Sequence, residues 1–330
     1  MATNDIDLIE KNLSKLNIEN REINKLSIIR NENFKQLDNI VIYKQTYVLV
    51  ADWGDRPGIH ILDNDLNYLQ KLELDLFINS MFVLINNNIG MICKPEDSND
   101  ENFKIKIFKI SKAEKRLDFE EIKSVDILEN KKKIRPYGLC QSETTNNLYF
   151  MDTFLKTRNI LIYNENLDFI SKKHIRLPTK FRKPGLRDLK IKGDFIFLTD
   201  HQFLDFREFG NRCIHIFDLN INYINSLEFN KSFNMNPVWL HIEPRPTKEN
   251  IGENYQFYCC NWLKEGNIIF IDQNNEIIDG NQISFNYPFS SVKFGNKILI
   301  TQTIPNSNYI TLREKPMHFA GSELFFIILD

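Results

Sequence analysis

The chain has 330 residues, with 42 Lys and Arg against 44 Asp and Glu and a formal net charge of −2. Its hydrophobic content of 42% excludes wholesale disorder, and a folded chain of this length buries enough apolar surface to need no disulfide or metal staple. No window approaches the roughly 18 uncharged apolar residues of a membrane helix, and five Cys without a C-x-x-C pair fit thiols in a reducing compartment. We therefore expect a cytoplasmic protein with no membrane association.

The first 20 residues predict a short helical segment that packs against the rest of the chain. Asn4 is a suitable N-cap. Four apolar residues would then share one face of the helix: Ile6, Ile9, Leu13 and Leu16. Beyond residue 20 no continuous helical periodicity remains, so we expect the regular elements of residues 21–330 to be strands.

A two-strand pattern recurs through residues 21–330. An apolar strand ends in Asp or Asn, a variable loop follows, and a second apolar strand ends near another Asp or Asn. The pattern is found at 47–52 with 58–66, 148–152 with 159–167, 195–200 with 213–221, and 257–261 with 267–275. A weaker copy lies at 89–94 with 103–110, and a last one lies at 297–302 with 324–330. Such recurrence is typical of repeat architectures.

Two further strands frame each repeat. A first strand, often opened by Pro as in Pro136-Tyr-Gly-Leu, precedes the pattern, and an alternating strand such as 168–177 follows it. Four short strands in each period of about 40 to 60 residues predict an all-β fold, a six-bladed β-propeller of four-stranded blades. The last repeat lacks its fourth strand, so we expect the strand at 21–30 to pair with it and close the ring. Residues 21–330 would then form a single propeller domain that follows the segment 1–20 in the chain.

This layout resembles that of the NHL-type six-bladed β-propellers over about residues 21–330. The matching pieces are the Pro-opened first strand, the second strand ending in Asp, and an asparagine-led third strand, as in Asn159-Ile-Leu-Ile-Tyr and Asn267-Ile-Ile-Phe-Ile-Asp. Six-bladed propellers that are similar to this one include protein-binding and RNA-binding modules and gluconolactonase-type hydrolases. The resemblance therefore implies a fold rather than one activity.

Asp52, Asp152, Asp200 and Asn261 occupy the same place in four repeats, at the end of the second strand. One interpretation is a ring of carboxylates, with Asp52, Asp152 and Asp200 holding a divalent cation such as calcium. The other is that each side chain closes the turn after its strand by accepting backbone N–H groups. Recurrence in most repeats favours the turn.

A lactonase resemblance would imply a divalent ion in the central channel, held by Glu, Asp and Asn, and a water activated by it. Candidate ligands on or near first strands are Asp38, Glu143, Asp188 and Glu243. The first repeat offers Asp38 and Asn39 where the lactonase pattern carries Glu.

Several aromatic or imidazole side chains stand near the presumed channel face. Trp53 and Trp262 directly follow Asp52 and Asn261, and His201 takes the equivalent place after Asp200. Trp239 lies on the first strand of the fifth repeat. Exposed on that face, these side chains would anchor a ligand, and packed between blades they would belong to the core.

Residues 131–192 carry 15 Lys and Arg against five Asp and Glu, a local net charge of +10. Two connections within this stretch should emerge on the same face, and they contribute Lys132, Arg135, Arg182 and Arg187. Such a patch would attract an acidic protein or the phosphates of single-stranded RNA, with aromatic neighbours available for base stacking. A solvated lysine-rich surface is the alternative interpretation.

Cys213 and His215 lie two residues apart on one strand and therefore on one face. The alternation of a third propeller strand accounts for the pair, and no second ligand pair stands at a zinc-like spacing. We therefore expect packing here rather than catalysis or zinc binding.

The sequence favours an interaction module that binds a protein partner or another acidic ligand on one propeller face. We expect no catalytic residue and no cofactor. A metal-dependent lactonase-like hydrolase with a channel site and a propeller that binds single-stranded RNA stay open as alternatives.

Overall fold

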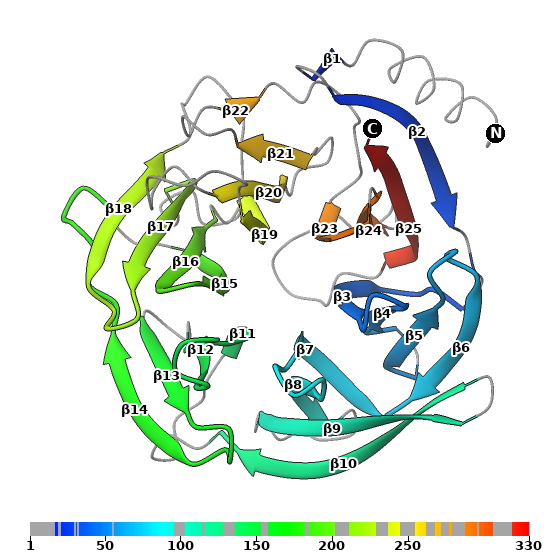
Figure 1. Ribbon diagram of the computed structural model, residues 1–330, viewed down its shortest axis with the longest axis horizontal. Helices are drawn as coiled ribbons and strands as arrows, with labels where there is room; N and C mark the ends of the chain where they lie inside the picture. The colour runs from blue at the N-terminus through cyan, green and yellow to red at the C-terminus, as the bar shows by residue number, and fades with distance from the viewer. Residues whose placement is uncertain are drawn as a thin grey trace. The chain divides into compact units, whose positions relative to one another are not determined.

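The structure is a computed structural model, and every regular element that it describes is a β-strand (Figure 1). The described residues are 17–18, 21–29, 31, 33–54, 56–95, 103–113, 116–127, 136–152, 158–181, 185–201, 211–228, 237–244, 255–261, 268–271, 277–278, 288–295, 297–305 and 319–329. Within these ranges no helix could cross a bilayer. Two compact units are present, one of residues 39–228 and one of residues 1–38 with 229–330.

The unit 39–228 holds four antiparallel sheets of four strands, each formed by strands that follow one another in the chain. The first sheet contains β3 (Leu37–Tyr43), β4 (Tyr47–Asp52), β5 (Gly58–Leu62) and β6 (Tyr68–Glu73). The second contains β7 (Leu76–Val83), β8 (Ile89–Pro95), β9 (Lys104–Ala113) and β10 (Arg116–Asp126). The third contains β11 (Pro136–Gln141), β12 (Leu148–Asp152), β13 (Asn159–Tyr163) and β14 (Phe169–His174). The fourth contains β15 (Leu186–Lys192), β16 (Phe195–Asp200), β17 (Cys213–Asp218) and β18 (Tyr223–Glu228).

The second unit holds two sheets. One contains β19 (Pro237–Pro244), β20 (Tyr255–Asn261), β21 (Ile268–Ile271) and β22 (Ile277–Ile278). The other has the order β1-β2-β25-β24-β23, with β1 (Asn17–Ile18), β2 (Arg21–Ile29), β23 (Pro288–Phe294), β24 (Lys297–Pro305) and β25 (Phe319–Leu329). The antiparallel pairing of β2 with β25 confirms that the N-terminal strand joins the last sheet.

The structure bears on the expected number of blades. Four blades, not six, form the unit 39–228, and the remaining two sheets belong to the other unit, so a six-bladed closed ring and a single domain 21–330 stay predictions. The predicted helical residues of the segment 1–20, from Asn4 to Leu16, lie outside the described residues. Asn17–Ile18, which follow them, form a strand that pairs with β2.

The burial of the strands explains their composition. In the first and third sheets the second and third strands are buried almost throughout, so they need apolar residues on both faces, as in β5 and β13. The fourth strands, β6 and β14, are instead partly exposed along their length and carry mixed polar and apolar residues. Solvent therefore meets the outermost strand of each of these sheets.

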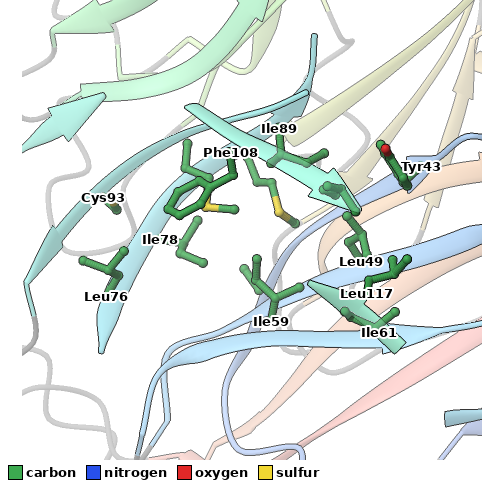
Figure 2. Close-up of a cluster of buried hydrophobic side chains, with 14 residues drawn as sticks. Tyr43, Leu49, Ile59, Ile61, Leu76, Ile78, Ile89, Cys93, Phe108 and Leu117 are labelled. Atoms are coloured by element: carbon green, nitrogen blue, oxygen red, sulfur yellow. The ribbon is translucent and has the colours of Figure 1, made fainter. Parts of the chain in front are cut away.

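Apolar clusters fill the spaces between successive sheets of the unit 39–228. The first cluster packs Leu49 and Ile59 of the first sheet against Ile78 and Phe108 of the second (Figure 2). Two further clusters join the second sheet to the third and the third to the fourth. Successive blades thus share a continuous core, which fixes where their first strands lie.

The first strands carry irregularities that place polar groups inside the fold. The register between the first and second strands shifts in β7, β11 and β15, as a β-bulge requires. In β11 the irregular position is Gly138, with φ at +65°, and an added Cβ there would lie 2.4 Å from the backbone nitrogen of Leu189 in β15. Glycine is therefore required where these neighbouring first strands meet.

A repeated turn joins the third and fourth strands of three sheets. In the fourth sheet, the Asp218 carboxylate accepts the backbone N–H groups of Asn220 and Asn222, and Ile221 between them has a φ of 67°. Asp63 and Asn164 accept equivalent bonds in the first and third sheets. These Asx side chains account for much of the Asp and Asn at the ends of third strands.

Candidate functional site

Asp52, at the end of β4, is buried and binds donors of its own sheet. Its Oδ1 accepts the backbone N–H of Gly54 at 2.8 Å, as in an Asx turn. Its Oδ2 lies 2.7 Å from Nε2 of His60 on β5 and 3.8 Å from Nζ of Lys71 on β6. The carboxylate therefore closes the turn, as the sequence favoured, and also ties the second strand to the third and fourth.

Asp200, at the end of β16, binds donors of the fourth sheet and of the segments beside it. Oδ1 accepts the backbone N–H groups of Gly185 at 2.7 Å and of Asn211 at 3.1 Å. Oδ2 lies 2.6 Å from Nδ2 of Asn211 and 3.0 Å from Nε2 of His215. Asp200 and His215 are both fully buried, so this carboxylate is the centre of a polar cluster inside the sheet.

His215 extends this cluster across three strands. Its Nδ1 lies 2.7 Å from Oγ of Ser226 on β18, and that hydroxyl lies 2.8 Å from the Tyr223 hydroxyl. The Phe181 ring meets the imidazole edge to face, with centroids 4.7 Å apart. The Sγ of Cys213 lies 3.6 Å from Nε2. A carboxylate, an imidazole, a hydroxyl and a thiol thus meet in one buried place.

Asp152, the third predicted ligand, is buried at the end of β12 and is paired in register with Asn159. The amide oxygen of Asn159 lies 3.2 Å from Nδ1 of His174 on β14. The third sheet has Leu161 where the first and fourth carry His60 and His215, so the Asp–His pair is not repeated there. A cation held jointly by Asp52, Asp152 and Asp200 stays a prediction.

Polar side chains are also buried on the first strands of the unit 39–228. Ser80 on β7 accepts the backbone N–H of Leu139 on β11 at 2.9 Å, and the Asn79 amide group donates to the Pro136 carbonyl. Asp188 on β15 forms an ion pair of 3.2 Å with Lys190. Asn39 on β3 is 3% exposed, and its Oδ1 has no hydrogen-bond partner among the described residues. An oxygen acceptor is therefore buried on the first strand of the first sheet.

The structure places Trp53 and His201 inside the unit rather than fully exposed on a face. Trp53 is half-buried, its indole N–H donates to the Ile78 carbonyl, and its ring lies 6.0 Å from that of Phe77. His201 is 2% exposed. Burial, followed by the positive charges of Arg187 and Arg212, lowers the pKa of His201 to about 3, so the ring is neutral at neutral pH.

Of the predicted basic residues, the structure describes Arg187 alone. Its guanidinium lies 4.4 Å from the centroid of the Tyr137 ring, and the side chain is half-buried between β15 and β11. Trp239 lies on β19. The remaining predicted residues lie outside the described ranges: Lys132, Arg135, Arg182 and Trp262.

Sequence reasoning missed the Asp–His pairs. A signal was present, because His60 and His215 both lie in an Ile-His-Ile context on a third strand, Gly58-Ile-His-Ile and Cys213-Ile-His-Ile. The loop between the second and third strands differs in length, however, so His60 follows its aspartate by eight positions and His215 follows by 15. Only the strand register brings each pair together.

No family model matches the chain, and no curated protein matches it. Among solved structures, a protein described as a candidate gluconolactonase aligns over 93% of this chain and 93% of its own, with 11% identity and a TM-score of 0.57. A candidate 6-phosphogluconolactonase from Bacteroides fragilis aligns over 87% of this chain and 86% of its own, with 11% identity and a TM-score of 0.49. The first likeness, together with the sheet topology, establishes an all-β propeller architecture of four-stranded antiparallel blades.

Proposed function

We propose that the chain is a hydrolase of the lactonase type, which opens a cyclic ester with the help of a divalent cation held by first-strand oxygens. The observation that carries the proposal is the buried Oδ1 of Asn39, for which the described part of the chain supplies no hydrogen-bond donor. A buried amide oxygen without a donor costs about 1–3 kcal/mol, so it needs a compensating ligand. The neighbour described as a candidate gluconolactonase shares the architecture along nearly the whole chain.

The residues present fit a hard cation. Amide and carboxylate oxygens are the ligands that calcium and magnesium prefer, and first strands offer them at Asn39, Asn79 and Asp188. Asn79 uses its amide nitrogen to bind the Pro136 carbonyl, which fixes the orientation of its amide group. The Asp188 carboxylate is fully buried and paired with Lys190, so a counter-charge already stands beside it.

A bound divalent cation would polarise the ester carbonyl and acidify a water molecule. In this proposal Asn39 contributes a neutral oxygen ligand from β3, and Asp188 contributes a negative one from β15. Lys190, whose Nζ lies 3.2 Å from Oδ2 of Asp188, places a positive charge beside that carboxylate.

The test combines cation binding with lactone hydrolysis. Protein treated with a chelator would be titrated with calcium in a calorimeter, and hydrolysis of a sugar lactone would be followed by proton release. Asn39→Ala should remove calcium binding and hydrolysis together. Asn225→Ala, which changes an exposed asparagine on β18, should change neither. Calcium-independent hydrolysis, or no hydrolysis with any of several lactones, would overturn the proposal.

A second candidate is an interaction module for an acidic partner, and Arg187 is the observation that favours it. Its guanidinium stacks on Tyr137, and its charge and that of Arg212 both act on His201. Two cations and an aromatic ring from β11, β15 and the segment before β17 could together receive a carboxylate-rich peptide.

Fluorescence anisotropy with a labelled acidic peptide and with a labelled single-stranded RNA separates the partner classes. For an acidic protein partner, Arg187→Ala should weaken peptide binding about tenfold, which corresponds to about 1.4 kcal/mol. Lys109→Ala removes an exposed charge on β9 of the second sheet and should have no effect. Tighter binding of RNA than of peptide, with a steep salt dependence, would reject the acidic-protein reading in favour of RNA.

A further inference from the structure

The first and fourth sheets contain the same buried Asp–His pair, but only the fourth adds a thiol. In both sheets the aspartate ends the second strand, and the histidine lies on the third. The residue opposite the aspartate is Gly58 in the first sheet and Cys213 in the fourth. A Cβ at position 58 would lie 2.1 Å from the carbonyl oxygen of Leu72, so no side chain fits there.

The fourth sheet therefore presents three different metal-binding atoms to one another. Sγ of Cys213, Nε2 of His215 and a carboxylate oxygen of Asp200 all lie within 4.8 Å of each other. Elsewhere in the described ranges, no other group of three or more His, Cys, Asp or Glu side chains meets this spacing. All three residues are fully buried.

The distances between these ligand atoms suit an ion with tetrahedral coordination. With zinc–sulfur and zinc–nitrogen bonds of about 2.3 and about 2.0 Å, ligand atoms of one tetrahedron stand about 3.3 to 3.6 Å apart. Sγ of Cys213 and Nε2 of His215 are 3.6 Å apart, and Nε2 and Oδ2 of Asp200 are 3.0 Å apart. A shift of a few tenths of an ångström would admit the ion between them.

The surroundings of His215 suit a metal ligand as well. A histidine that binds a metal through one ring nitrogen uses the other in a hydrogen bond that fixes its orientation. Nδ1 of His215 lies 2.7 Å from Oγ of Ser226, and Phe181 packs on the ring. In the first sheet the equivalent contact, from Nδ1 of His60 to the Tyr68 hydroxyl, is longer at 3.4 Å.

The charge of a divalent cation would also suit this cluster. Metal binding releases the proton of a ligating thiol, so the two charges of the cation would neutralise one thiolate and one carboxylate. Buried charges in proteins are paired in this way or coordinate metals.

We propose that Asp200, Cys213 and His215 form a binding site for a thiophilic divalent cation of the zinc class. The side-chain oxygen of Asn211, whose Nδ2 donates to Oδ2 of Asp200 at 2.6 Å, or a water molecule would complete the coordination. The site lies between the second and third strands of one sheet, on residues other than the first-strand oxygens of the proposed hydrolase. It takes a softer metal because a thiolate is among its ligands.

The test uses cobalt as a spectroscopic substitute for zinc on the full chain. Titration of chelator-treated protein with Co²⁺ should give a thiolate-to-cobalt charge-transfer band and the intense visible bands of a four-coordinate ion, saturating at one equivalent. Zinc should abolish both signals by competition. Cys213→Ser should remove the charge-transfer band, and Ser226→Ala should weaken zinc binding about 10- to 100-fold.

His60→Asn is the matched control, because it breaks the Asp–His pair of the first sheet, which has no thiol. This variant should lower the free energy of unfolding while leaving the cobalt spectrum and the zinc stoichiometry unchanged. Wild-type protein that shows no charge-transfer band with excess Co²⁺ would overturn the proposal without any variant. A band that survives in Cys213→Ser would overturn it too, because another cysteine would then be the ligand.

Discussion

Replacing Asp200 by Ala tests whether the buried carboxylate organises the fourth sheet. The substitution removes the acceptor of four donors, two from the backbone and two from side chains. Asn211 is half-buried, so its two donors can turn to water, but the N–H of Gly185 and the ring of His215 are buried and cannot. Each donor left without a partner costs about 1–3 kcal/mol, and a small cavity adds to this. We expect a loss of about 3–5 kcal/mol in the free energy of unfolding.

The same sheet supplies a matched control in Asp218, whose carboxylate accepts three donors in the half-buried turn after β17. Water replaces the lost acceptor there, so Asp218→Ala should cost about 1 kcal/mol or less. Urea unfolding with a chelator present, followed by far-ultraviolet circular dichroism, measures both variants. Equal losses in the two variants would refute the reasoning, because burial would then have no bearing on the cost of an absent acceptor.

Three further predictions concern the interior of the unit 39–228. Gly138→Ala should lower the free energy of unfolding in urea by more than about 2 kcal/mol, because the new Cβ would meet the β15 backbone and the residue has a positive φ. Gly295→Ala, at a φ of 59° but in open space, should lower it by less. His201 is neutral in the folded protein, so protonation below its ordinary pKa of 6.5 favours the unfolded chain. The free energy of unfolding should therefore fall by up to about 1.4 kcal/mol per pH unit as the pH is lowered from 6.5 to about 3. His201→Gln should lack this part of the pH dependence. Trp53→Phe should cost about 1–2 kcal/mol in thermal or urea unfolding, because the Ile78 carbonyl loses its indole donor; an unchanged midpoint would show that water replaces it.

The repeat and most strand boundaries could be predicted from the sequence. The expected strands at 47–52, 148–152 and 195–200 are β4, β12 and β16 to the residue, and the weak second copy is β8 with β9. The reason is that strands buried on both faces need unbroken apolar runs, and their ends need Asx, Gly or Pro turns. The recurrence of the run then identifies the blade.

The orientation of loop residues could not be predicted in this way. Trp53 and His201 follow their aspartates in equivalent positions, and the sequence allowed either of them to face a ligand. Whether such a side chain turns inward depends on the neighbouring sheet: the Ile78 carbonyl on β7 receives the Trp53 indole, and Arg187 and Arg212 stand near His201. Ile78 lies on another sheet, and Arg187 and Arg212 belong to other segments of the chain than His201, so no local pattern records these partners.

The sequence by itself determined the all-β repeat, the four-strand order of each blade and the use of Asp at the end of second strands. Only the tertiary structure decided what those carboxylates bind. Asp52 meets His60 across eight positions, and Asp200 meets His215 and Cys213 across a longer loop, because antiparallel register rather than sequence spacing sets which side chains stand opposite. Which polar side chains meet in this protein therefore depends on the strand register, while the fold follows from the hydrophobic periodicity of the sequence.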